Sequence, residues 1–205
     1  MTSRRRDRPL SRSELVDAAL RIVDSEGLKA LTMRRLADAV DVEAMSLYKH
    51  VPSKEVLLDW TVDRMRSETR LPDPLPKDWR ELMATLFGEY RRVLAAHPNM
   101  LPLAVRRTDG LAPAGLRFLI DQGFGSDDAV ELYQSLAAFT LGYSMLSSPF
   151  VQPDQTGLPP DLAERAAKWK DDTCERGLRM LIEAYEPRKA GDRQQSERLE
   201  KRPVG

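Results

Sequence analysis

The fold of this 205-residue chain is decided by the stretch from Leu31 to Leu58, which reads LTMRRLADAVDVEAMSLYKHVPSKEVLL. Thr32 is a good N-cap for a first helical run, whose apolar residues recur at helical spacing. A turn of three residues separates it from a second run, Ala44 to His50, which ends before Pro52 because proline cannot donate to the preceding turn. The spacing predicts two helices joined by a tight turn, as in a helix-turn-helix motif.

Capping signals predict two further helices around this motif. Upstream, Ser11 and Glu14 form a capping box that starts a helix, and Gly27 ends it. Downstream, Ser53 caps a helix that runs from residue 54 to about residue 68.

A proline-rich break at residues 71–76 predicts a domain boundary. The second half is helical throughout, with a regular amphipathic stripe from Trp79 to Leu94. We expect Ser126 to cap a long helix, with Asp127 and Asp128 at the positive end of its dipole. The expected helices of this half cover residues 79–96, 101–107, 113–122, 126–147 and, as one helix, 161–185.

These elements predict an all-α protein, because runs of β-branched residues are scarce and no long stretch alternates with period two. We expect a disordered basic arm at residues 1–10 and a helix-turn-helix domain with its connecting helix at 11–70. A helical ligand-binding and dimerisation domain is expected at 76–186, followed by a disordered polar tail at 187–205.

Charge is distributed unevenly although the net charge is zero. The first twelve residues hold five arginines against one acidic residue, Asp7; they are Arg4, Arg5, Arg6, Arg8 and Arg12. Such an arm can bind phosphates without making the whole protein basic. A solubilising tail is an equally good explanation of the arm taken alone.

Several classes of protein are disfavoured. Cys174 is the only cysteine, so no disulfide framework is possible. No apolar run approaches the length of a membrane span and no signal peptide precedes the first helix, so we expect a cytoplasmic protein without a membrane partner. The two histidines lie far apart, and no phosphate-binding glycine loop, serine elbow or metal-ligand pair occurs. We therefore expect no enzyme, no cofactor, no metal and no catalytic residue.

The quoted stretch resembles the DNA-binding signature of the tetracycline-repressor (TetR) family. The match includes Leu31-Thr32, Arg34-Arg35-Leu36-Ala37, Leu47-Tyr48, His50-Val51 and Lys54. The second half is similar to the tetracycline-repressor type of C-terminal domain, through Trp79, Tyr90-Arg91-Arg92, Leu116-Arg117-Phe118, Gln122-Gly123-Phe124 and Phe139-Thr140-Leu141-Gly142. The resemblance implies a dimeric, ligand-responsive regulator that acts as a repressor on a palindromic operator in double-stranded DNA.

The resemblance also implies roles for individual residues. Thr32, Tyr48, His50 and Lys54 would hold phosphates, while Arg34 and the outward face of the short helix, Ala44, Met45, Ser46 and Lys49, would meet base edges. An arginine can bridge guanine O6 and N7, and apolar groups can touch a thymine methyl. The arm with Arg4, Arg5 and Arg6 would follow phosphates or enter a minor groove.

Simpler explanations exist for some of these residues. His50 fits a plain helix-end histidine, Tyr48 a core aromatic, and the pair Arg34 and Arg35 a solvated face. The motif around them favours the DNA-binding interpretation.

In the resembling family, the C-terminal helices enclose a ligand and two long helices pair with a second subunit. Met and aromatic side chains make adaptable pocket walls, although ordinary core packing explains any single one of them. The candidate pocket residues are Met65, Met83, Leu86, Phe87, Tyr90, Met100, Leu103, Phe118, Phe139 and Tyr143.

The chain departs from tetracycline–magnesium repressors at the pocket. Where those proteins present histidines and an asparagine, this chain has Thr69 or Arg70, Leu86, and Leu103 or Ala104. We therefore expect a small, largely apolar or aromatic effector rather than tetracycline–magnesium. Two alternatives remain open: a DNA-binding protein of the same fold without a ligand, and an activator instead of a repressor.

Overall fold

The computed structural model describes residues 10–107, 113–151, 159–167 and 171–186, and these residues form helices and connecting turns without a strand. The all-α prediction is confirmed. The expected disordered tail and all but the last residue of the expected basic arm lie outside the described residues. No helix within the described ranges is long and apolar enough to cross a membrane.

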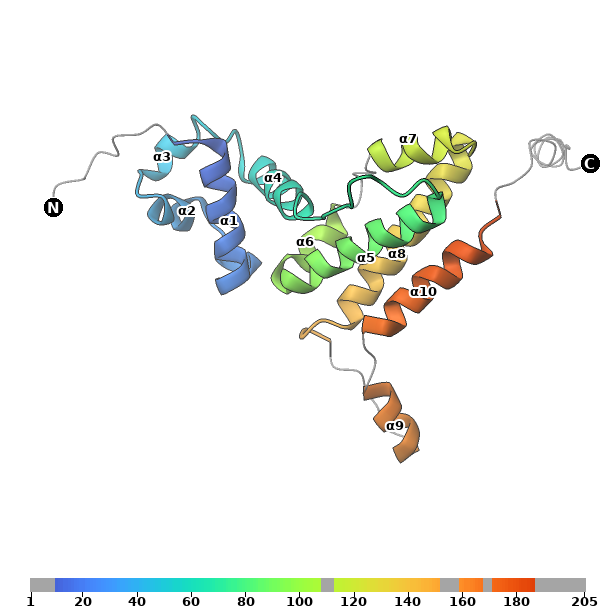
Figure 1. The fold of residues 1–205 in the computed structure, drawn as a ribbon. Coiled ribbons are helices and arrows are strands. Elements are labelled where there is room, and N and C mark those ends of the chain that lie inside the picture. The colour runs from blue at the N-terminus through green and yellow to red at the C-terminus, as the bar shows by residue number, and fades with distance from the viewer. Residues whose placement is uncertain (1–9, 108–112, 152–158, 168–170, 187–205) are drawn as a thin grey trace, which may run out of the picture.

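The N-terminal half forms a compact head of four α-helices (Figure 1). Its helices are α1 (Arg12–Glu26), α2 (Met33–Ala39), α3 (Ala44–Leu47) and α4 (Lys54–Arg66), with a short 3₁₀ turn, η1 (Leu28–Ala30), between the first two. The local signals hold: Ser11 and Glu14 form the complete capping box, and the side chains of Thr32 and Ser53 cap α2 and α4. Gly27 ends α1 with a positive φ of 84°, a conformation that glycine adopts without strain.

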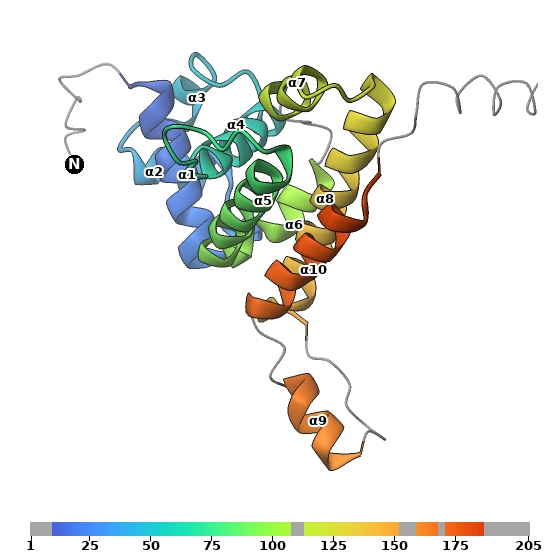
Figure 2. The ribbon, with the colours of Figure 1, turned by 45° about the vertical axis from the view of Figure 1, so that its right-hand side comes forward.

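The C-terminal half is built around α8, which packs against α5, α6, α7 and α10. In Figures 1 and 2, α10 runs beside α5 and α8, whereas α9 projects away from this bundle. The elements are α5 (Trp79–Ala96), the 3₁₀ turn η2 (Pro98–Met100), α6 (Leu101–Arg106), α7 (Pro113–Asp121), α8 (Ser126–Leu146), α9 (Pro160–Ala167) and α10 (Asp171–Ala184).

Three expectations about helix ends are wrong. Ser126 is the first helical residue of α8 and Gly125 is its N-cap, with no side-chain cap. Where one helix over 161–185 is expected, the structure has two helices, α9 and α10. Helix α3 ends at Leu47 rather than His50 and continues as hydrogen-bonded turns to Val51, because a residue before proline avoids the helical region.

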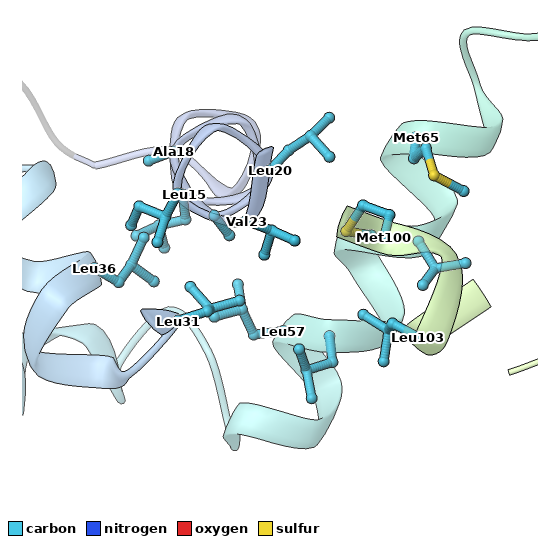
Figure 3. Close-up of a cluster of buried hydrophobic side chains, with 14 of the residues drawn as sticks. Leu15, Ala18, Leu20, Val23, Leu31, Leu36, Leu57, Met65, Met100 and Leu103 are labelled. Atoms are coloured by element: carbon cyan, nitrogen blue, oxygen red, sulfur yellow. The ribbon is translucent and has the colours of Figure 1, made fainter. Parts of the chain in front are cut away.

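A first buried cluster holds the head together and also reaches into the second half (Figure 3). Leu15, Leu36 and Leu57 from the head are fully buried in it, and so are Met100 and Leu101 from the segment after α5. The cluster therefore includes residues from both sides of the proline-rich segment at 71–76, so the head shares this core with parts of α5, α6 and α8.

A second cluster lies among α5, α7, α8 and α10 and is rich in aromatic rings. Phe87 meets Tyr133 edge-on at a centroid distance of 5.1 Å, and Trp79 meets Phe124 edge-on at 4.9 Å. Gly177 of α10 lies so close to Phe139 of α8 that an added Cβ would stand 2.5 Å from the ring. This close approach seats α10 on α8.

Candidate nucleic-acid interface and effector region

Helix α3 is anchored by two side chains and exposes the rest. Leu47 and Val51 have no exposed surface and belong to the first buried cluster, as the sequence predicts. The backbone of Val51 donates to the carbonyl of Leu47 at 2.8 Å, which fixes the turn that follows α3. Two apolar anchors thus hold this short segment against α2 and the first buried cluster, and its opposite face is left free.

The free face carries the candidate base-reading side chains. Met45 is 77% exposed and Tyr48 is 49% exposed, and Lys49 and His50 are exposed as well. The idea that Tyr48 is a core aromatic is therefore wrong. The exposed methyl end of Met45 suits contact with a thymine methyl group.

Ala44 and Ser46 are half-buried at the base of this face. The hydroxyl of Ser46 donates to the carbonyl of Glu43 at 2.7 Å. Its proton is therefore already engaged, and its oxygen can still accept from a base amino group.

The remaining described candidates flank α3. Thr32 is exposed, and its oxygen accepts from the backbone N–H of Arg35 at 3.0 Å, so its hydroxyl proton remains available for a phosphate. Arg34 and Lys54 are exposed, and Lys54 opens α4, where the helix N-terminus also favours an anion. Arg4, Arg5 and Arg6 lie outside the described residues.

The neighbouring arginines differ in their partners. Arg35 forms a bidentate pair with Glu26, with Nε at 3.1 Å and Nη2 at 2.5 Å from its carboxylate. The side-chain hydrogen bond and the charge of Glu26 raise the pKa of Arg35, and the same hydrogen bond lowers the pKa of Glu26. Arg35 is therefore directed to α1, and Arg34 is left as the α2 arginine that faces solvent.

The candidate effector residues fall into two groups. Met65, Met100 and Leu103 are buried in the first cluster, and Tyr90 contacts both clusters. The second cluster holds the six others, which are Met83, Leu86, Phe87, Phe118, Phe139 and Tyr143. The structure thus brings six candidates together and separates three from them, with Tyr90 between the two groups.

Two hydroxyls in this region are buried without a hydrogen-bond partner among the described residues: those of Tyr90 and Ser144. A buried donor left unpaired is costly, so in folded proteins such groups usually meet water or a ligand. Close by, the guanidinium of Arg91 lies over the ring of Tyr143 at 5.6 Å. The α5–α8 interface therefore offers hydroxyls and a cation beside an aromatic wall.

An open depression of about 400 Å³ lies elsewhere, on the head, lined by Glu14, Asp17, Arg21, Ala39, Val40 and Asp41. None of the ten candidate effector residues lines it. Among the described residues, no group of three or more histidine, cysteine or acidic side chains could hold a metal ion.

His97 is a residue to which the sequence assigns no role. Its two ring nitrogens lie 2.9 Å from Asp24 of α1 and 3.0 Å from Glu68, which follows α4. These partners are 73 and 29 residues away in the chain, so no local pattern could reveal the cluster.

A short helix with one exposed face, anchored by Leu47 and Val51 in a four-helix head and followed by a helical domain, defines a helix-turn-helix DNA-binding regulator. The comparisons with known proteins agree. Residues 15–59 match the family described as bacterial regulatory proteins, tetR family, and residues 71–170 match the tetracyclin repressor-like C-terminal domain. The chain belongs to the TetR family of transcriptional regulators.

Relatives of known sequence support this assignment. An HTH-type transcriptional regulator of Saccharopolyspora erythraea is 32% identical over 161 residues, which cover 76% of this chain and 68% of the relative. The class E tetracycline repressor of Escherichia coli is 33% identical over 141 residues, covering 65% of this chain and 66% of the repressor. The chain thus spans about two thirds of the length of these relatives.

Solved structures show the same architecture. The TetR family protein ActR of Streptomyces coelicolor in complex with (S)-DNPA superposes with a TM-score of 0.71 at 30% identity, covering 85% of this chain and 96% of ActR. ActR in complex with actinorhodin gives a TM-score of 0.69 at 28% identity, covering 85% of this chain and 94% of ActR.

Proposed function

We propose that this chain is a repressor that binds a palindromic operator as a homodimer and is released by a small, largely apolar effector. The observation that carries the proposal is the exposed face of α3, where Met45 and Tyr48 stand free while Leu47 and Val51 are fully buried. A recognition helix must combine these two properties to enter a major groove without unfolding its domain.

The expected contacts to DNA are of two kinds, those to phosphates and those to bases. Lys54, Thr32 and the Tyr48 hydroxyl are suited to phosphate oxygens, which fix the register of the head on the duplex. Arg34 is suited to guanine and Met45 to thymine, and these two contacts would supply sequence discrimination.

A second subunit would provide the other half of the operator contact. Leu146 of α8 and Met180 and Leu181 of α10 are exposed apolar side chains on helices that lie side by side (Figure 2). An isologous pairing of these helices would cover them. A two-fold dimer sets its heads about 34 Å apart or somewhat more, which matches one turn of DNA.

The effector would occupy the region between α5 and α8. The aromatic wall of Phe87, Phe139 and Tyr143 favours an apolar or aromatic molecule, and the hydroxyl of Tyr90 offers it one hydrogen-bond donor. Similarity to ActR, which is solved with small molecules bound, supports a ligand-binding role for this domain. A protein of the same fold without a ligand remains the alternative.

Effector and DNA would compete through α4. This helix begins at Lys54 on the DNA side, and its Met65 is buried in the shared core next to Met100 and Leu103 (Figure 3). An effector that prefers a tilted α4 would change the spacing of the two heads and so lower operator affinity.

A gel-shift titration on the DNA upstream of the protein's own gene tests the proposal. Arg34→Ala should weaken specific binding by about 1–3 kcal/mol if the arginine makes a bidentate base contact, and Tyr48→Ala should weaken it too. Arg117→Ala, at an exposed arginine of α7, is the matched control and should leave binding unchanged. Equal affinity for all three variants would overturn the proposal.

A further inference from the structure

The side chain of His97 joins the head to the rest of the molecule. It lies at the C-terminus of α5 and is only 12% exposed. Nδ1 lies 2.9 Å and 3.0 Å from the two carboxylate oxygens of Asp24 in α1, and Nε2 lies 3.0 Å from Glu68, in the turn after α4. One ring therefore bridges two segments that belong to the head and its connecting helix.

The chemistry of these contacts fixes the protonation state. Ionised carboxylates only accept hydrogen bonds, and a neutral imidazole can donate through one nitrogen alone. With a carboxylate at both nitrogens, both contacts are hydrogen bonds only when the ring is a doubly protonated imidazolium. Burial by itself lowers the pKa of His97, but the hydrogen bonds and charges of Glu68 and Asp24 outweigh it, so the pKa is raised above 6.5.

Charged groups from all three neighbouring elements surround the ring. Arg64 of α4 binds Glu68 at 2.8 Å and also Asp17 of α1 at 2.7 Å. Arg92 of α5 donates to the carbonyl of Glu68 at 3.2 Å and pairs with Glu89. The hydrogen bond from His97 is the first cause of the lowered pKa of Glu68. The carboxylate of Glu68 is thus shared by His97 and Arg64, and Arg92 holds its backbone carbonyl.

On the other side of the ring, the amide of Asn99 donates to the backbone carbonyl of Asp24 at 2.8 Å. The turn η2 that carries Asn99 contacts α1 directly. Because this amide does not titrate, the contact between α1 and η2 persists when the ring loses its proton. Loss of the proton therefore removes one link between α5 and the head and leaves this other link in place.

We propose that His97, in its imidazolium form, is the positioning residue that holds the DNA-reading head at a fixed angle, so that operator binding is linked to the protonation of this side chain. The inference rests on the proposed function. When the ring loses a proton, one carboxylate faces a nitrogen lone pair and its link opens. A dimer needs both heads at one spacing, so the looser head binds the operator less well.

The chain offers a clean test because it contains only two histidines, His50 and His97. His50 is exposed at the DNA face and would itself contribute a pH dependence, so all variants are made in a His50→Gln background. Operator affinity is then measured from pH 5.5 to 8.0 at constant salt, with the full-length protein.

In the His50→Gln protein, we expect operator affinity to fall by about three-fold or more as the pH rises across this range. The reason is that the DNA-bound protein would hold the proton on His97 more tightly than the free protein does. His97→Gln and His97→Arg in the same background should both give a flat profile, the second with higher affinity at pH 8.0. A profile that is the same with and without His97 would overturn the inference.

Two measurements separate the possible failures. Circular dichroism at each pH verifies folding, and if His97→Gln fails to fold, the permanently charged His97→Arg carries the comparison. Absence of specific operator binding by the unmodified protein at every pH would contradict the proposed function itself. Specific binding with an unchanged pH profile would contradict only the role of His97.

Discussion

The guanidinium of Arg64 on α4 donates to the carboxylate of Asp17 on α1 at 2.7 Å, across 47 residues of sequence. The hydrogen bond that Arg64 donates to Asp17 is the first cause of the raised pKa of Arg64, and Glu68 adds to it. This pair ties the connecting helix to the first helix of the head, on the same side as His97.

Arg64→Ala should lower the free energy of unfolding by about 0.5–1 kcal/mol, because the pair is partly exposed and such pairs contribute modestly. Urea denaturation followed by circular dichroism measures it. Arg179→Ala is the control, since Arg179 pairs with Glu175 four residues earlier on the exposed surface of α10, a contact within one helix. Its effect should be smaller, and an equal loss in both variants would contradict a tertiary role for Arg64.

Two side chains of α3, Leu47 and Met45, should affect protein stability and DNA binding separately. Leu47→Ala should destabilise the protein by about 2–4 kcal/mol, because it removes a fully buried side chain. Met45→Ala should leave the melting temperature unchanged and still weaken operator binding. Thermal melts and gel shifts on both variants give the comparison, and a destabilised Met45→Ala would mean that this side chain is packed in solution.

Stability should depend on pH through His97 and Glu68. The raised pKa of His97 means that its contribution is complete below about pH 6.5 and is lost as the pH rises through its folded pKa. The lowered pKa of Glu68 means that its contribution is complete above about pH 4.5 and is lost as the pH falls through its own folded pKa. Urea midpoints should be highest between these limits, and His97→Gln should remove the alkaline decline.

Tyr90→Phe should leave the free energy of unfolding unchanged or raise it by about 1 kcal/mol, because it removes a buried hydroxyl without a hydrogen-bond partner. The same change should reduce the affinity of the effector once that molecule is known. Tyr133→Phe serves as the matched control in the same buried cluster. Clear destabilisation by Tyr90→Phe would show that its hydroxyl has a partner within the protein.

Tetracycline with magnesium should not bind tightly. Leu86, Leu103 and Ala104 occupy the positions where the tetracycline–magnesium repressors are expected to present polar ligands, and Leu103 and Ala104 are buried in the shared core. His97 is already engaged at both ring nitrogens. Isothermal titration calorimetry should show no heat of binding at micromolar protein, and a tight complex would contradict the expected apolar effector.

Local signals in the sequence predict most of the head correctly. Ser11, Thr32 and Ser53 each cap the helix expected of them, because capping depends on residues within one turn. The burial of Leu47 and Val51 also follows from the sequence, because two apolar residues four positions apart lie on the same face of a helical turn. The end of α3 is less well predicted. Pro52 disfavours the helical conformation at Val51, whereas the residues before Val51 favour a helix.

Long-range relationships could not be predicted in the same way. The division of the effector candidates between two clusters depends on how α5 and α6 pack against the head. The apolar spacing within each helix does not predict that packing. The cluster around His97 joins residues from three distant segments, each unremarkable in its own surroundings. The apolar pattern over residues 161–185 gives no sign that this stretch forms two helices, α9 and α10.

The core that runs from Leu36 and Leu57 into Met100 and Leu101 has a practical consequence for building chimeric regulators. A reading head cut at the proline-rich segment and fused to a foreign sensor would leave behind the side chains that cover its inner surface. Grafts that retain α6 and the turn before it should give soluble hybrids, whereas grafts that end at residue 70 should aggregate.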